Sequence, residues 1–165
     1  MSTGGSVSAA WTFPSSREKP DGALRLDMFD ILGSASMTLT GGCHCGAIRY
    51  QLEGEPLHGG QALCHCSDCR RAAGAPMVGW SMFPEDAFTV TRGKAREYAS
   101  SEHGRRWFCE TCGTGLHYRN ARNLPGLVDI QAATLDDPDA IPAVAHIQTA
   151  DRVGWMKDAH RLPEF

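Results

Sequence analysis

The sequence lacks any block of Lys and Arg residues, and its formal net charge is −3 with histidine neutral. Binding to nucleic acid or to an acidic membrane surface through a basic face is therefore not expected. No apolar run approaches the roughly 18 residues that a membrane-spanning helix needs. The first residues carry neither early positive charge nor a long apolar core, so a secretory signal is not expected. We therefore expect a cytoplasmic protein, in which thiols stay reduced.

Disulfide pairing is not expected either, because the seven cysteines are an odd number and all fall in short clusters. The 165 residues suggest one domain, which is long enough to bury a core without cross-links. The clusters are Cys43-His44-Cys45, Cys64-His65-Cys66 extended by Cys69, and Cys109-Glu110-Thr111-Cys112. Such spacing is typical of metal ligands.

Residues 1–36 differ from the rest of the chain. The stretch up to Ser16 is rich in Ser, Gly and Ala without a clear period, which predicts a partly mobile N-terminal extension. Residues 21–33 fit a short amphipathic helix that would place Leu24, Met28, Ile31 and Leu32 on one face. The cysteine-containing domain is predicted to occupy residues 37–165.

This domain reads as short strands and turns. Ile48, Tyr50 and Leu52 alternate with polar residues, which predicts a half-buried strand. Residues 77–83 form a second apolar segment that Pro84 ends. Further strands are predicted at 127–133 and 143–149.

Two local structures can be predicted in more detail. Residues 88–91 and 95–99 flank a glycine-containing turn and predict a β-hairpin. Ser67 and Asp68 are predicted to cap a short helical turn that reaches Ala73. Many short strands with few helices predict a compact, mainly β domain of antiparallel sheets.

The middle cluster can bind one ion without help from distant residues. In an extended segment, residues i and i+2 point to the same side, so Cys64 and Cys66 can share an ion with nearby Cys69. Three protein ligands leave a fourth position open, which is the arrangement of a catalytic zinc.

The two remaining pairs are each insufficient alone but together supply four thiolates. A closed tetrahedron of four thiolates is typical of structural zinc. Its predicted ligands are Cys43, Cys45, Cys109 and Cys112. In the Cys109–Cys112 turn, the glycine that follows can adopt positive φ and free backbone N–H groups for the sulfurs. We therefore predict two Zn²⁺ ions per chain, one structural and one catalytic.

The cysteine clusters are compatible with three other interpretations. The cysteines can be read as buried core residues, which is common for free thiols. Both zincs can be structural if a carboxylate or a histidine, such as His58, His103 or His117, completes the second site. Cys69 can also serve as a free redox thiol.

Three motifs resemble the glutathione-dependent formaldehyde-activating enzyme (Gfa) family, which is linked in vertebrates to centromere protein V. They are Gly41-Gly42-Cys43-His44-Cys45-Gly46-Ala47-Ile48-Arg49-Tyr50, Cys64-His65-Cys66-Ser67-Asp68-Cys69-Arg70, and Phe108-Cys109-Glu110-Thr111-Cys112-Gly113-Thr114. The ending, from His146 through Trp155 to Phe165, is similar to the family's C-terminal signature. The resemblance covers residues 38–165.

This resemblance implies an Mss4-like fold of small antiparallel sheets. It implies the same division of the cysteines, with a structural zinc on the outer pairs and a catalytic zinc on Cys64, Cys66 and Cys69. It also implies a carbon–sulfur lyase that adds glutathione to formaldehyde and gives S-hydroxymethylglutathione. The expected partners are thus a small thiol and a small aldehyde.

Residues near the middle cluster suggest further roles. His44 and His65 lie between ligands and would point to the opposite face of an extended segment, which favours structural roles. Arg70 and Arg71 can pair with glutathione carboxylates, or can be solvated charges at the end of a helical turn. Among the aromatic residues, Trp80 is best placed to line a pocket.

Two rival functions are less well supported by the sequence. A non-enzymatic zinc module of the same fold would bind a partner, but the basic or proline-rich extension expected of such a protein is absent. A redox enzyme similar to methionine sulfoxide reductase is disfavoured by the cysteine spacing, which does not match paired Cys-x-x-Cys motifs.

Overall fold

The computed structural model describes residues 37–165, so the predicted helix at 21–33 lies outside the described residues. Strands β1 (Thr38–Gly42), β2 (Arg49–Glu53) and β5 (Phe88–Arg92) form a three-stranded sheet in the order β1-β2-β5. A second sheet has the order β10-β3-β4-β9-β8-β7-β6. Its strands are β3 (Gln61–Cys64), β4 (Val78–Pro84), β6 (Arg96–Ala99), β7 (Gly104–Phe108), β8 (Gly115–Asn120), β9 (Leu124–Gln131) and β10 (Ala143–Ile147).

Helical structure within residues 37–165 is limited to one short α-helix, α1 (Ser67–Ala73), and several 3₁₀ turns. These turns are Leu57–Gly59, Glu85–Ala87, Ala132–Thr134, Pro138–Ala140, Thr149–Asp151, Gly154–Lys157 and Ala159–Arg161. The prediction of a mainly β fold with few short helices is confirmed. Within the described residues, no helix has the length and apolar character that a membrane span requires.

Strand β2 shows the alternation that the sequence predicts. Tyr50 and Leu52 are buried, whereas Arg49 and Gln51 are only half-buried. The Tyr50 hydroxyl lies 2.7 Å from the Thr134 hydroxyl, which joins the first sheet to the turn that follows β9. The alternation therefore marks the face that packs on the second sheet.

The predicted hairpin between residues 88–91 and 95–99 is wrong. Strand β5 pairs with β2, and β6 pairs with β7 in the other sheet. The turn at Gly93 carries the chain from one sheet to the other, with φ of 74° and a pro-Cβ position only 2.3 Å from the Ala47 carbonyl oxygen. Because Phe88 meets the ring of Tyr50 across this pairing, β5 gains an apolar neighbour that a local hairpin would not provide.

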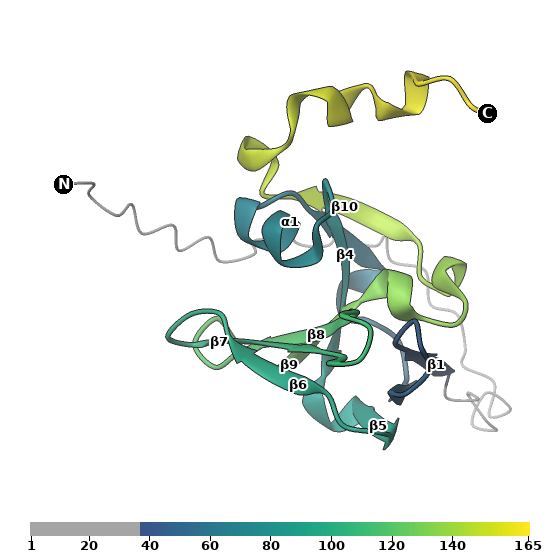
Figure 1. Cartoon of the computed structure of the whole chain (residues 1–165), viewed down its shortest axis with the longest axis vertical. Helices are drawn as coiled ribbons and strands as arrows, with labels where there is room; N and C mark the ends of the chain where they lie inside the picture. Colours follow the sequence, from purple (N-terminus) through teal and green to yellow (C-terminus); the bar gives the residue numbers. More distant parts are fainter. Residues whose placement is uncertain (1–36) are drawn as a thin grey trace, which may run out of the picture. The chain divides into compact units, whose positions relative to one another are not determined.

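One strand pair departs from the antiparallel pattern. Strand β10 runs parallel to β3 and brings Ile147 opposite Cys64. Parallel pairing needs a long crossover, and here the partners are separated by most of the domain. Figure 1 shows β10 near α1, and in the sheet β3 lies between β10 and β4. The last strand therefore supports the segment that holds the middle cysteine cluster.

The main core lies between the two sheets, and a smaller apolar cluster lies at the middle cysteines. The main core includes Leu52 of β2, Phe83 of β4 and Val128 of β9, each fully buried. The smaller cluster consists of Cys64, Val78 and Trp80, with Cys66, Cys69, Tyr118 and Ile147 packed against it. The middle cysteines thus have an apolar backing of their own.

Candidate metal centres

Four thiols from two distant segments converge after β1 and after β7. The Sγ atoms of Cys43, Cys45, Cys109 and Cys112 all lie within 4.8 Å of one another. Cys45 Sγ lies 3.6 Å from Cys43 Sγ and 3.8 Å from Cys109 Sγ. Tetrahedral Zn²⁺ with Zn–S bonds of about 2.3 Å places its sulfurs about 3.8 Å apart. The donor set and its spacing therefore fit a tetrahedral zinc ion.

The glycine after each of these pairs adopts positive φ, which the sequence predicts for Gly113. Gly46 and Gly113 have φ of 74° and 77°. Their N–H groups donate to the carbonyls of Cys43 and Cys109 at 2.9 and 2.8 Å, which closes both turns. The Ile48 N–H donates to Cys43 Sγ at 3.2 Å. Although burial opposes ionisation of Cys43, this hydrogen bond helps to lower the pKa of its thiol.

Thr114 links the two turns, a role that was not predicted from the sequence. Its hydroxyl lies 3.2 Å from Cys112 Sγ and accepts a hydrogen bond from the His44 N–H at 3.1 Å. The contact with Thr114 lowers the pKa of Cys112 to about 5, which favours the thiolate. A hydroxyl two residues after a clustered cysteine is a local signal that could have identified it.

The three middle thiols also converge. The Sγ atoms of Cys64, Cys66 and Cys69 lie within 4.8 Å of one another, at the end of β3 and the start of α1. Cys66 is the N-cap of α1, and its sulfur accepts a hydrogen bond from the Cys69 N–H at 3.2 Å. The predicted cap at Ser67 and Asp68 is therefore wrong by one position. The sulfur of Cys66, and not a side-chain oxygen of Ser67 or Asp68, accepts the capping hydrogen bond.

The electrostatics of this cluster favour one thiolate at its centre. Hydrogen bonds from the thiols of Cys64 and Cys69 lower the pKa of Cys66 to about 2. The interactions of Cys64 with the other two thiols, together with burial, raise the pKa of Cys64. A cation bound among the three sulfurs would allow all three thiols to ionise, because a coordinated thiol is deprotonated. This donor set also fits a zinc ion.

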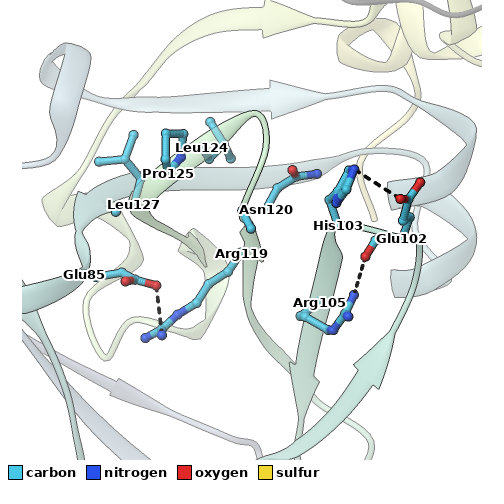
Figure 2. Close-up of a pocket in the computed structure, with 11 residues that line it drawn as sticks. Glu85, Glu102, His103, Arg105, Arg119, Asn120, Leu124, Pro125 and Leu127 are labelled. Carbon is cyan, nitrogen blue, oxygen red and sulfur yellow. Dashed lines mark hydrogen bonds and ion pairs between the residues drawn. The ribbon is translucent and has the colours of Figure 1, made fainter.

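The histidines considered as a fourth ligand do not join these thiols. Among residues 37–165, the cluster contains three cysteines and no histidine or carboxylate. His117 is stacked on Trp107 at 4.6 Å, and burial lowers its pKa to about 3. His103 lines a separate pocket of about 430 Å³ and points toward Glu102, 3.7 Å away (Figure 2). His58 is also outside the cluster. One position beside the thiols is therefore left without a protein ligand from the described residues.

His65 is buried and bonds to the C-terminal strand instead of the thiol cluster. Its Nε2 lies 2.9 Å from His146 Nδ1, and its backbone N–H donates to the Ile147 carbonyl at 3.0 Å. Burial, with the nearby positive charge of Arg152, lowers the pKa of His65, so the ring is neutral. This arrangement agrees with a structural role.

Asp151, which was not predicted as a site residue, supports the start of α1. Its carboxylate accepts a hydrogen bond from the Ser67 N–H at 3.2 Å. An acidic group is favourable at a helix N-terminus, where backbone N–H groups lack partners. Together with the pairing of Ile147 and Cys64, this contact makes the C-terminal segment part of the framework around the three thiols.

Arg106 of β7 reaches the three-thiol cluster from a distant part of the sequence. Its Nη2 donates to Asp68 Oδ2 at 2.7 Å and to Cys69 Sγ at 3.7 Å. Its guanidinium carbon lies 5.0 Å from the centre of the Tyr118 ring and 6.0 Å from that of Trp80. Burial alone would lower the pKa of Arg106, but the contacts with Asp68 and Cys69 outweigh it and raise the pKa.

The structure places the other predicted neighbours as follows. Trp80 is buried in the same apolar cluster as Cys64, and its ring lies 6.2 Å from that of Tyr118. Arg70 donates through Nε to the His65 carbonyl at 3.1 Å, so part of its side chain supports the cysteine segment. Arg71 is exposed.

Known proteins are similar to this chain in sequence and in fold. A model of the glutathione-dependent formaldehyde-activating enzyme family matches residues 38–151. A protein of Halomonas elongata, provisionally named a glutathione-dependent formaldehyde-activating enzyme, is 28% identical over 129 residues, which cover 73% of this chain and 81% of that protein. The crystal structure of a Rhodobacter sphaeroides protein is similar with a TM-score of 0.51 and 28% identity, over 65% of this chain and 98% of that one. With residues 38–151 matched, the chain belongs to the glutathione-dependent formaldehyde-activating enzyme family.

Proposed function

We propose that this protein is a zinc-dependent carbon–sulfur lyase of the Gfa type. It forms or cleaves a thiol–aldehyde adduct such as S-hydroxymethylglutathione. The observation that best supports this function is the cluster of Cys64, Cys66 and Cys69, which no histidine or carboxylate of residues 37–165 completes. Three protein ligands leave a position for a substrate atom, as in catalytic zinc sites.

The two clusters would then have different roles. The thiols of Cys43, Cys45, Cys109 and Cys112 would hold a structural zinc that ties the turn after β1 to the turn after β7. Cys64, Cys66 and Cys69 would hold the second ion, and Zn²⁺ bound there would keep a substrate thiol ionised. None of the seven cysteines forms a disulfide, which suits a reducing compartment such as the cytoplasm.

The reaction needs little beyond proximity and one proton transfer. A bond forms between the thiol sulfur and the aldehyde carbon, and the proton lost by the thiol ends on the aldehyde oxygen. No electron donor or acceptor is needed. Trp80 and Tyr118 pack beside the cysteines and would limit the access of water there. Holding the thiol next to the aldehyde would accelerate the addition.

Glutathione carboxylates would be bound by cationic side chains at the end of α1. Arg70 and Arg71 are the proposed partners, because guanidinium groups form paired hydrogen bonds with carboxylates. Arg71 is exposed at this position, and the only Arg70 side-chain nitrogen with a hydrogen bond among residues 37–165 is Nε. Their terminal nitrogens are therefore suited to this contact.

The function can be tested by the exchange of ¹³C-formaldehyde with glutathione, followed by NMR with the uncatalysed rate subtracted. We expect the zinc-loaded protein to accelerate the exchange and Cys64→Ala to abolish the acceleration. Ser67→Ala is a matched control, because it lies in the same segment and removes no thiol. If the wild-type protein with two bound zincs gives only the background rate, the proposed activity is wrong.

A further inference from the structure

The proposed substrate creates a charge problem at the three-thiol centre. Zn²⁺ with three thiolates has a formal charge of −1, and an incoming thiolate would make it −2. Cys64 is buried, and Cys66 and Cys69 are only half-exposed. Uncompensated negative charge is costly in such surroundings, because little water is available to solvate it. A cation at the sulfurs would remove much of this cost.

Arg106 is placed to supply that cation. Its Nη2 donates to Cys69 Sγ at 3.7 Å, and its side chain is only 12% exposed. Its other partner, Asp68, is 72% exposed, so water screens the Asp68 charge far more than that of Arg106. Among residues 37–165, no other cationic side chain donates to a sulfur of this cluster.

The surroundings of Arg106 fix its position. The rings of Trp80 and Tyr118 lie within 6.0 Å of its guanidinium carbon. Such contacts restrict the rotamers of a long side chain, so little entropy is lost when it meets the sulfur. Its Nε is buried without a partner among the described residues, which shows that the group is held there at some cost.

We propose that Arg106 is a positioning residue of the three-thiol centre. It holds Cys69 Sγ and compensates the negative charge of the sulfurs, so that the open position accepts an anionic thiolate. That the ligand is a thiolate rests on the proposed function, whereas the contact between Arg106 and Cys69 Sγ does not. Arg106 does not need to touch the substrate, because it acts through Cys69.

The test uses the Co²⁺-substituted protein, in which sulfur-to-metal charge-transfer absorption reports on the thiolates. The difference spectrum against Cys64→Ala isolates the bands of the three-thiol centre. Glutathione serves as the anionic ligand and imidazole as the neutral one. The variants are Arg106→Met and Arg106→Lys. The matched control is Arg105→Met, which removes a neighbouring arginine of β7 that instead pairs with Glu97 at 3.5 Å.

We expect Arg106→Met to weaken glutathione binding by about 10-fold and to leave imidazole binding within about twofold, because only the anion needs the charge. Arg106→Lys should be intermediate, since it keeps the charge and loses the planar fork. The charge-transfer band should move to longer wavelength in Arg106→Met, because the sulfur loses a hydrogen-bond donor. Arg105→Met should change neither the affinity for the two ligands nor the position of the band.

Asp68→Asn is a second variant, which keeps Arg106 and can be measured even if the Arg106 variants do not fold. Because Asp68 competes with Cys69 for the guanidinium, its replacement by asparagine should shift the band to shorter wavelength and tighten glutathione binding. An unchanged band in both Arg106→Met and Asp68→Asn would overturn the contact, and equal loss of both ligands in Arg106→Met would overturn the charge argument. If wild type loaded with Co²⁺ binds no glutathione, the proposed function fails, while the band shifts still decide whether Arg106 holds Cys69.

Discussion

Replacing Asp129 by asparagine should stabilise the protein, and more so at alkaline pH. Asp129 lies on β9, directly opposite Tyr118 of β8 and Met82 of β4, and is 8% exposed. Burial raises the pKa of this carboxyl to about 7 from an ordinary value of 3.8. The folded protein therefore keeps a proton that the unfolded chain releases between about pH 4 and pH 7.

The sign and the size of the effect follow from this difference. Because the unfolded state binds fewer protons in this interval, stability falls as pH rises through it and levels off above pH 7. The full penalty from Asp129 is about 4 kcal/mol, at 1.36 kcal/mol for each pH unit between the two pKa values. At pH 5 only about 1.6 kcal/mol of the penalty is present.

The assay is urea denaturation of zinc-saturated wild type and Asp129→Asn at pH 5 and pH 8. The advantage of the variant should grow by about 2 to 3 kcal/mol between the two pH values. Comparison at each pH removes the shared effect of acid on the metal sites. Asp86→Asn, at an exposed position, serves as control and should show no such growth. If Asp129→Asn has the same advantage at both pH values, Asp129 is ionised in the folded protein and the reasoning is wrong.

Three other perturbations test the remaining parts of the structure. Cys112→Ser should lose one zinc and several kcal/mol of stability, because that metal binds only the folded arrangement. Cys64→Ala should also lose one zinc but melt close to the wild-type temperature. Metal analysis and calorimetry measure both properties, and equal melting temperatures for the two variants would contradict the division of roles. His117→Gln should reduce acid sensitivity by about 2 kcal/mol at pH 5, because burial lowers the pKa of His117 to about 3 and stability is lost as pH falls below about 6.5. Urea denaturation at pH 5 and pH 7 tests this, and parallel losses in variant and wild type would refute it. Gly93→Ala should destabilise more than Gly126→Ala, since both glycines have positive φ but only Gly93 has a carbonyl oxygen at its pro-Cβ position; identical melting temperatures would show that the turn relaxes.

Much of the candidate site could be predicted from the sequence because its information is local. Cysteines two or three residues apart can meet at one ion whatever the rest of the chain does, so the three-thiol cluster followed from spacing alone. The glycine after the Cys109–Cys112 pair showed where positive φ was needed, and Gly113 adopts it. The alternation along β2 likewise marked which side chains are buried.

Pairings across the fold could not be read in this way. The sequence around Gly93 resembles a hairpin, yet β5 pairs with β2, where the ring of Phe88 lies 5.6 Å from that of Tyr50. The parallel pairing of β10 with β3 joins segments about 80 residues apart, and no local pattern encodes it. The same limit applies to Arg106, whose contact with Cys69 spans 37 residues.

The sequence by itself determined which atoms can bind metal, because donor chemistry and short spacing are properties of the local chain. It also identified the family through those motifs. Only the tertiary structure decided that His117 and His103 lie away from the three thiols, that the C-terminal strand supports them, and that a partly buried arginine faces them. These outcomes depend on which sheet faces pack together, and that packing is a sum of many weak, long-range apolar contacts that no single segment specifies.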